Sequence, residues 1–203
     1  MTPREIRGVF ILFATMGRMR IRAALMLWVF ANAAWAQSFI GASLGQSDIG
    51  SGITKDLITS GAFDGVDTGF KLYSGYMFGR NFGFEGAYVD LGDARYSGTF
   101  GGVPVAGGKL QASGYTISAL VSYPVGSDLA VFGKLGLFVW EWTASDTTAG
   151  RPFDTADRGN DVAFGLGASY NLGRHFALRA EWERFKLDDT DADLLSFGLL
   201  WRF

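Results

Sequence analysis

The stretch Leu194–Phe203, LLSFGLLWRF, decides the fold. A β-strand sends alternate side chains to opposite faces, so one face of this segment is apolar throughout, while the other includes Ser196, Gly198 and Arg202. The apolar face consists of Leu195, Phe197, Leu199, Trp201 and Phe203. An exposed strand of a soluble sheet usually interrupts such a face with charges or proline. The pattern favours a strand that faces lipid, with a core strand of a β-sandwich as the alternative.

Residues 1–36 have the three parts of a secretory signal peptide. A basic flank precedes an apolar run at 23–33, and an A-x-A box follows. The residues that define these parts are Arg18, Arg20 and Arg22, then Ala34, Ala36 and Gln37. The apolar run is too short to cross a bilayer, which takes about 20 residues. We predict cleavage after Ala36, with translation starting at Met16 or Met19, and one mature domain at 37–203.

The composition of the mature chain narrows the class of protein. Residues 37–203 contain 13 Lys and Arg against 19 Asp and Glu, a net charge of −6 that argues against a nucleic-acid partner. The chain has no cysteine, which excludes disulfides and acylation at a lipoprotein cysteine. Glycine and aromatic residues are abundant, proline is scarce, and no linker divides the chain. These features indicate a single β domain.

Alternation of apolar and polar residues recurs in eight segments. They are 38–46, 67–78, 82–91, 110–123, 129–142, 161–172, 176–185 and 194–203. Short turns follow the second, fourth and sixth segments, and mostly longer polar loops follow the others. Short periplasmic turns and long external loops are typical of bacterial outer-membrane barrels. The sequence predicts an all-β, eight-stranded, antiparallel up-and-down transmembrane β-barrel with both termini in the periplasm.

The segment 129–142 fits this pattern least well. If Lys134 points into the barrel, the same parity sends four rings inward: Phe132, Phe138, Trp140 and Trp142. Either a bulge shifts the register of this strand, or the rings fill the lumen. The sequence leaves both interpretations open.

Charged residues are rare within the predicted strands. They are Lys71, Glu85, Lys134, Arg179, Glu181 and Glu183. A soluble domain exposes many more charges, since about a quarter of its residues are charged, so these six are predicted to pair inside a lumen. Outward rings form two predicted belts, as lipid interfaces favour. One belt has Phe70, Tyr88, Tyr115, Phe164 and Trp182, and the other has Phe78, Phe82, Tyr123, Tyr170, Phe176, Trp201 and Phe203.

Four stretches resemble OmpA-type transmembrane barrels, the outer membrane protein β-barrel family. They are DTGFKLYSGY (67–76), FEGAY (84–88), GLGASY (165–170) and ALRAEW (177–182). The resemblance implies a Gram-negative outer-membrane location and an inward Glu–Arg cluster that plugs or gates the lumen, matched by Glu85 and Arg179. The family's lysine on the fourth strand has no counterpart here, because Leu120 occupies its place, so a gating switch is not carried over.

The same resemblance implies partners for the chain. The apolar face that ends at Phe203 is similar to the assembly signal that the barrel-assembly machinery reads. Outer-membrane lipid, lipopolysaccharide and periplasmic chaperones are the other expected partners, and a monomer is the expected state. No cofactor, metal site or catalytic group is predicted.

Three functions compete at this stage. A structural barrel with surface interactions comes first, because an eight-stranded barrel is just wide enough for side chains to fill it. Its acidic loops could meet divalent cations that bridge lipopolysaccharide phosphates; they contain Asp146, Asp154, Asp157, Asp161, Asp188, Asp189, Asp191 and Asp193. A narrow ion or small-solute channel is the alternative. A lipid-modifying enzyme is disfavoured, because the only histidine, His175, lies in a predicted periplasmic turn without a neighbouring serine.

Overall fold

The computed structural model describes residues 37–50, 58–100, 103–148, 151–187 and 190–203. The predicted signal peptide, with Ala34 and Ala36 at its cleavage site, lies outside these residues. Within the described ranges, no helix has the length and apolar character needed to cross a membrane.

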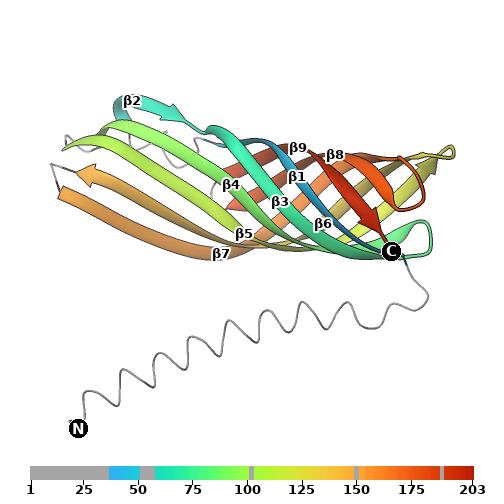
Figure 1. Ribbon diagram of the computed structural model, residues 1–203. Helices are drawn as coiled ribbons and strands as arrows, with labels where there is room; N and C mark the ends of the chain where they lie inside the picture. The colour runs from blue at the N-terminus through green and yellow to red at the C-terminus, as the bar shows by residue number, and fades with distance from the viewer. Residues whose placement is uncertain (1–36, 51–57, 101–102, 149–150, 188–189) are drawn as a thin grey trace, which may run out of the picture. The chain divides into compact units, whose positions relative to one another are not determined.

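Within the described residues, nine strands form a single antiparallel sheet that closes on itself (Figure 1). The strands are β1 (Gln37–Ile49), β2 (Ile58–Asp64), β3 (Val66–Phe78), β4 (Phe82–Phe100), β5 (Val103–Val125), β6 (Leu129–Thr148), β7 (Arg151–Asn171), β8 (Phe176–Leu187) and β9 (Thr190–Arg202). Their order is β2-β4-β3-β1-β9-β8-β7-β6-β5, and pairing of β4 with β5 closes the barrel. Strands β2 and β3 are separated only by Gly65 and pair with successive parts of the same strand, β4, so the wall has eight strands. The predicted eight-stranded antiparallel barrel is confirmed.

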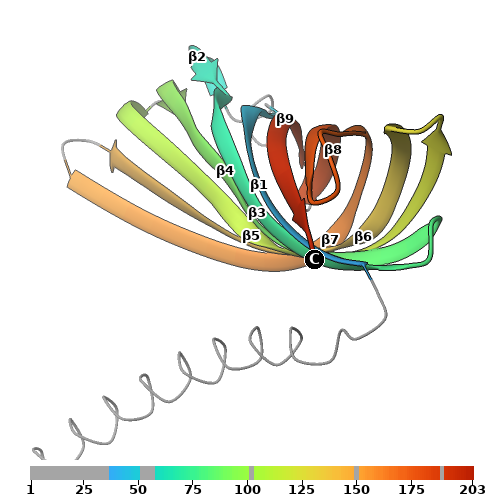
Figure 2. The ribbon, with the colours of Figure 1, turned by 45° about the vertical axis from the view of Figure 1, so that its right-hand side comes forward.

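The two ends of the barrel differ in how their strands are connected. At one end, named here the turn end, lie Gln37, Arg202 and the short turns at 79–81, 126–128 and 172–175. Gly79 and Gly126 have φ of 75° and 93°, which suits glycine in such tight turns. At the other end, named the hairpin end, the β4–β5 and β6–β7 hairpins extend far beyond the neighbouring strands (Figures 1 and 2).

The sequence predicts long loops between the third and fourth segments and between the fifth and sixth, at 92–108 and 144–160. This prediction is wrong, because most of these residues belong to paired strands. Pairing of β4 with β5 continues to Phe100↔Val103, and pairing of β6 with β7 continues to Thr148↔Arg151. The predicted end of the third segment is in fact a bulge, where Gly92 has φ of 73° and the carboxylate of Asp90 accepts its N–H at 2.9 Å. Glycine and aspartate at this point therefore mark a kink inside one long strand.

The segment 129–142 runs in regular register. Strand β6 pairs with β7 without a shift, and Phe132, Phe138 and Trp140 are buried, with Trp142 packed partly against them. The rings fill the lumen, and the alternative of a bulge in this segment is excluded.

Burial in the wall is the reverse of that in a soluble barrel. Leu44, Ile117 and Phe197 on the outside are 64%, 65% and 65% exposed, whereas Lys71 and Glu85 on the inside are fully buried. Glycine makes the narrow lumen possible: a Cβ on Gly136 would collide with the carbonyl oxygen of Ile117 on the adjacent strand. An apolar exterior around a polar interior is the arrangement that lipid requires.

Candidate functional site: the charged lumen and the lipid-facing wall

All six of the predicted lumenal charges meet in one buried cluster. Lys71 comes from β3, Glu85 from β4, Lys134 from β6, and Arg179, Glu181 and Glu183 from β8. None of the six is more than 7% exposed. With three cations and three carboxylates, the cluster is neutral as a whole.

Each cation contacts more than one carboxylate. The Nζ of Lys134 lies 3.0 Å from Glu85 and 2.7 Å from Glu181, and it also contacts Glu183. The Nζ of Lys71 lies 2.5 Å from Glu183 and contacts Glu181. A buried ion pair tolerates its desolvation only when its partners satisfy it in this way.

The guanidinium of Arg179 is held from several directions. It donates to Glu85 at 2.6 Å and to Glu181 at 3.1 Å. Its central carbon lies 4.6 Å from the ring of Tyr73 and 4.2 Å from the ring of Phe132. Such cation–π packing favours guanidinium over ammonium at this position. Tyr73 has the same parity as Lys71 on β3, and this signal would have identified it in the sequence.

Glycine at position 165 allows two of the charges to meet. Gly165 pairs with Lys134 on one side and with Glu183 on the other. A Cβ at this position would lie 2.9 Å from the Glu183 Cγ and 3.1 Å from the Lys134 Cε. The absence of a side chain therefore lets the lysine reach the glutamate across β7, a role that sequence reasoning missed.

Apolar side chains fill the lumen next to the cluster, on its hairpin side. They are Ile49, Val89, Leu91, Phe138, Phe185 and Leu194, all at most 2% exposed. The rings of Phe138 and Phe185 pack with centroids 4.8 Å apart. Ions would have to cross both this layer and the charge cluster to pass through the barrel.

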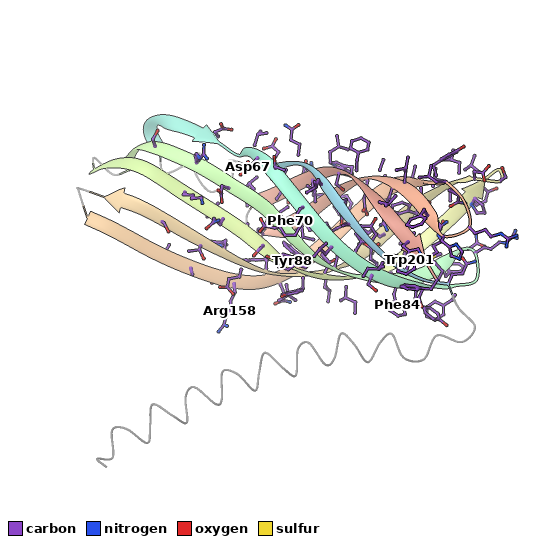
Figure 3. The ribbon with its side chains drawn as sticks, viewed as in Figure 1. Asp67, Phe70, Phe84, Tyr88, Arg158 and Trp201 are labelled. Atoms are coloured by element: carbon purple, nitrogen blue, oxygen red, sulfur yellow. The ribbon has the colours of Figure 1, made fainter. Side chains whose placement is uncertain are left out.

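Rings on the outer wall form two groups: in Figure 3, Phe70 and Tyr88 lie near the middle of the long wall, whereas Phe84 and Trp201 lie toward the turn end. Phe70, Tyr88 and Tyr115 follow one another around the wall toward the hairpin end, with centroids 5.8 and 5.2 Å apart. Toward the turn end, Trp201 packs on Phe203 at 4.6 Å. The face predicted as an assembly signal, with Leu195, Phe197, Leu199, Trp201 and Phe203, points outward and is 44–65% exposed.

A band of charged residues, named here the ionic collar, lies just beyond the rings at the hairpin end. It comprises Asp93, Lys109, Glu141, Arg158, Arg184, Lys186, Asp191 and Asp193. Lys109 pairs with Asp93 at 2.9 Å, and Arg184 makes two bonds of 2.7 Å to Asp193 while packing over Trp182. Within the described ranges, no ion pair involves Arg158, which is exposed opposite Glu141.

Asp67 also lies on the hairpin side of the ring belt, outside the part of β3 that crosses lipid (Figure 3). Its carboxylate accepts the backbone N–H groups of Asp93 and Thr68, both at 2.8 Å. These hydrogen bonds favour the charged form and hold the pKa of Asp67 below its usual value.

The acidic loops predicted to hold divalent cations are mostly paired strand. Asp157 and Asp161 lie on β7, and Asp191 and Asp193 on β9, where Asp193 is bound by Arg184. Asp161 accepts the indole N–H of Trp140 at 2.8 Å. Asp146 and Asp154 also lie on strands, whereas Asp188 and Asp189 fall outside the described residues. Across the described part of the chain, no group of three or more His, Cys, Asp or Glu is arranged to hold a metal ion.

His175 is exposed in the turn 172–175 at the turn end. It lies at the opposite end of the barrel from the collar, so it cannot act together with the collar's acidic residues in one site.

The sequence has relatives among curated outer membrane proteins. It is 31% identical over 207 residues to outer membrane protein A of Yersinia pseudotuberculosis, covering 93% of this chain and 56% of the relative. It is 30% identical over 169 residues to outer membrane protein A of Serratia marcescens, covering 78% of this chain and 43% of the relative. The chain thus spans about half the length of these relatives. Their names denote outer membrane proteins, and neither denotes an enzyme.

Solved structures share the fold. Ail, the attachment invasion locus protein of Yersinia pestis, matches with a TM-score of 0.57 at 21% identity, covering 83% of this chain and 99% of Ail. Ail has also been solved with the heparin analogue sucrose octasulfate, in a structure that matches with a TM-score of 0.56 at 20% identity, covering 83% of this chain and 99% of that one.

The family model for the outer membrane protein beta-barrel domain matches residues 22–203. Together with the lipid-compatible wall and the OmpA relatives, this match places the protein in the outer membrane of a Gram-negative bacterium. The chain belongs to the outer membrane protein β-barrel domain family.

Proposed function

We propose that this barrel is a non-conducting, non-enzymatic structural protein that stabilises the outer membrane by contacts with outer-leaflet lipopolysaccharide. The neutral charge cluster in the lumen, in which each of the six charged groups has an ion-pair partner, is the observation that carries the proposal. An open pore would instead keep part of its lumenal charge in contact with water.

The ionic collar is the proposed contact surface. It lies directly beyond the rings that mark one lipid interface, at the depth where lipid headgroups carry phosphates. The guanidinium of Arg158 is free to bind a phosphate with two parallel hydrogen bonds, while carboxylates of the collar could share divalent cations with neighbouring phosphates. In this proposal the hairpin end faces outward and the turn end faces the periplasm.

Lipopolysaccharide titration of the purified barrel tests the contact. Arg158→Ala should weaken binding several-fold, whereas Gln111→Ala, an outward polar residue on β5 at the same end, should leave it unchanged. Equal affinity of wild type and Arg158→Ala would contradict the proposed role of the collar.

The alternative is a narrow channel, and one observation favours it. Several buried polar atoms have no hydrogen-bond partner in the described part of the chain: Ser43 Oγ, Tyr73 Oη, Thr116 Oγ1, Arg179 Nε and Ser196 Oγ. Such atoms usually bind water, and a chain of waters could bypass the cluster. Single-channel recording in planar bilayers separates the two functions. Silence supports the closed barrel, and discrete steps that Lys134→Met enlarges support the channel.

The route to the membrane completes the proposal. Residues 1–36 would direct export and be removed before Gln37, periplasmic chaperones would carry residues 37–203, and the barrel-assembly machinery would read the face ending at Phe203. The mature protein would be a monomer. N-terminal sequencing of protein purified from outer membranes tests the cleavage site, and a mature chain that begins elsewhere would refute it.

A further inference from the structure

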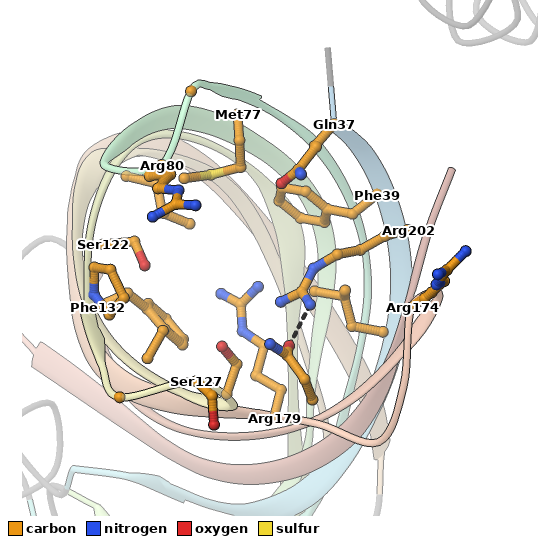
Figure 4. A pocket seen from close by; sticks show the side chains of 18 of the residues that line it. Gln37, Phe39, Met77, Arg80, Ser122, Ser127, Phe132, Arg174, Arg179 and Arg202 are labelled. Carbon is orange, nitrogen blue, oxygen red and sulfur yellow. Dashed lines mark hydrogen bonds between the residues drawn. The ribbon is translucent and has the colours of Figure 1, made fainter.

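The turn end of the barrel contains a cavity of about 470 Å³ (Figure 4). Among the described residues, its wall includes four arginines, Arg80, Arg174, Arg179 and Arg202, and no aspartate, glutamate or histidine. Neutral polar side chains such as Ser122 and Asn171 complete the lining, with the ring of Phe132 among the apolar parts of the wall. The carboxylates inside the lumen that lie nearest to this cavity belong to the charge cluster. Arg179 connects the two, because it lines the cavity and donates to Glu85 and Glu181.

These arginines come from four separate elements of the chain. Arg80 and Arg174 lie in two of the short turns, Arg202 ends β9, and Arg179 lies on β8. Figure 4 shows Arg80, Arg179 and Arg202 around the opening, while Arg174 stands at the rim and points away from it. The convergence follows from barrel closure, because the turns and the end of β9 all lie at the turn end.

In the described part of the chain, most of this positive charge has no carboxylate partner. Arg202 donates to the neutral side-chain oxygen of Asn171, and within the described ranges no ion pair involves Arg80, Arg174 or Arg202. Arg179 binds Glu85 and Glu181 through its terminal nitrogens, but its buried Nε has no partner. The carboxylate of Asp128 lies in the neighbouring turn, where it accepts the hydroxyl of Ser127 at 2.6 Å, and it is not part of the lining.

Guanidinium groups that converge on a partly enclosed cavity repel one another, and an anion bound between them offsets this repulsion. A phosphate offers several acceptor oxygens and matches the planar donor fork of arginine. The cavity also falls within the range of about 300–1,000 Å³ that is usual for small-molecule sites.

We infer that the turn-end cavity is a binding site for a phosphate monoester group, held chiefly by Arg80 and Arg202. The group could belong to a free phosphorylated solute or to the headgroup of an anionic lipid in the adjacent leaflet. The inference does not depend on the proposed lipopolysaccharide contact, which concerns the opposite end of the barrel.

Nuclear magnetic resonance of the folded barrel in nanodiscs tests the site. Inorganic phosphate is titrated onto barrels in phosphatidylcholine nanodiscs, and a second sample contains phosphatidic acid in the same lipid. The side-chain Nε–H signals of Arg80 and Arg202 should shift saturably, while that of Arg95, an exposed arginine on β4 toward the hairpin end that is not part of the ionic collar, should not. A shift with inorganic phosphate indicates a solute site, and a shift only with phosphatidic acid indicates a lipid-headgroup site.

Charge-removing variants identify the ligands. Arg80→Gln and Arg202→Gln should each weaken the affinity about tenfold or more, the loss expected for one hydrogen bond to a charged group. Arg95→Gln is the matched control and should bind like the wild type. Heat-modifiable mobility on gels confirms that each variant is folded. Absence of a saturable shift with either probe, or equal weakening by Arg95→Gln, overturns the inference.

Discussion

Replacing Lys134 with methionine should strongly destabilise the barrel. Methionine keeps much of the length of lysine but removes the charge that contacts Glu85, Glu181 and Glu183. Lys71 and Arg179 then face three carboxylates, and one buried negative charge is uncompensated.

The expected loss follows from that imbalance. Breaking a buried ion pair by removing one partner costs about 3–5 kcal/mol. Because about 1.4 kcal/mol is a factor of ten, the folding equilibrium constant should fall roughly a hundredfold or more. The double variant Lys134→Met/Glu183→Leu restores neutrality with two cations and two carboxylates, so it should recover most of the loss.

Urea unfolding in lipid vesicles measures these differences, with the folded fraction read from heat-modifiable mobility on gels. Lys186→Met is the control, because this lysine lies on the outer face of β8 and should change the stability by less than about 0.5 kcal/mol. The reasoning fails if Lys134→Met is as stable as the wild type, or if the double variant is less stable than the single one.

Three further predictions use the same unfolding assay. Gly165→Ala should cost about 1–3 kcal/mol, because its methyl group crowds Glu183 and Lys134; an unchanged stability would show that these side chains move aside freely. Phe197→Arg, on the lipid-facing wall, should cost about 2–4 kcal/mol in vesicles, and no cost would mean that lipid does not cover this face. The hydrogen bonds that lower the pKa of Asp67 stabilise the fold above the ordinary carboxyl pKa, and this contribution is lost as the pH falls through the folded-state pKa. The stability of Asp67→Asn should therefore fall less at acidic pH than that of the wild type. An identical fall in both proteins would contradict a contribution of the Asp67 carboxylate to acid sensitivity.

The strand segments that cross lipid could be predicted closely from the sequence. The predicted 67–78 corresponds to β3 (Val66–Phe78), and the predicted 176–185 to β8 (Phe176–Leu187). In these parts every second side chain must be apolar, so the period is clear. Beyond the ring belt, at 92–108 and 144–160, the sequence is rich in glycine, threonine and aspartate and does not alternate. The distal halves of the β4–β5 and β6–β7 hairpins therefore looked like loops.

Outside the segment 129–142, the sequence alone determined which side chains of the lipid-crossing strands face lipid and which face the lumen. Alternation is a local property of an extended chain, and one buried charge fixes the parity of its strand up to the next bulge. Only the tertiary structure decided which charges meet. Lys71 and Glu181 lie 110 positions apart, and their contact depends on the register of every intervening strand and on closure between β4 and β5. The same closure brings Arg80 and Arg202 to one cavity, since residues with no shared periodicity become neighbours only when the sheet is joined into a cylinder.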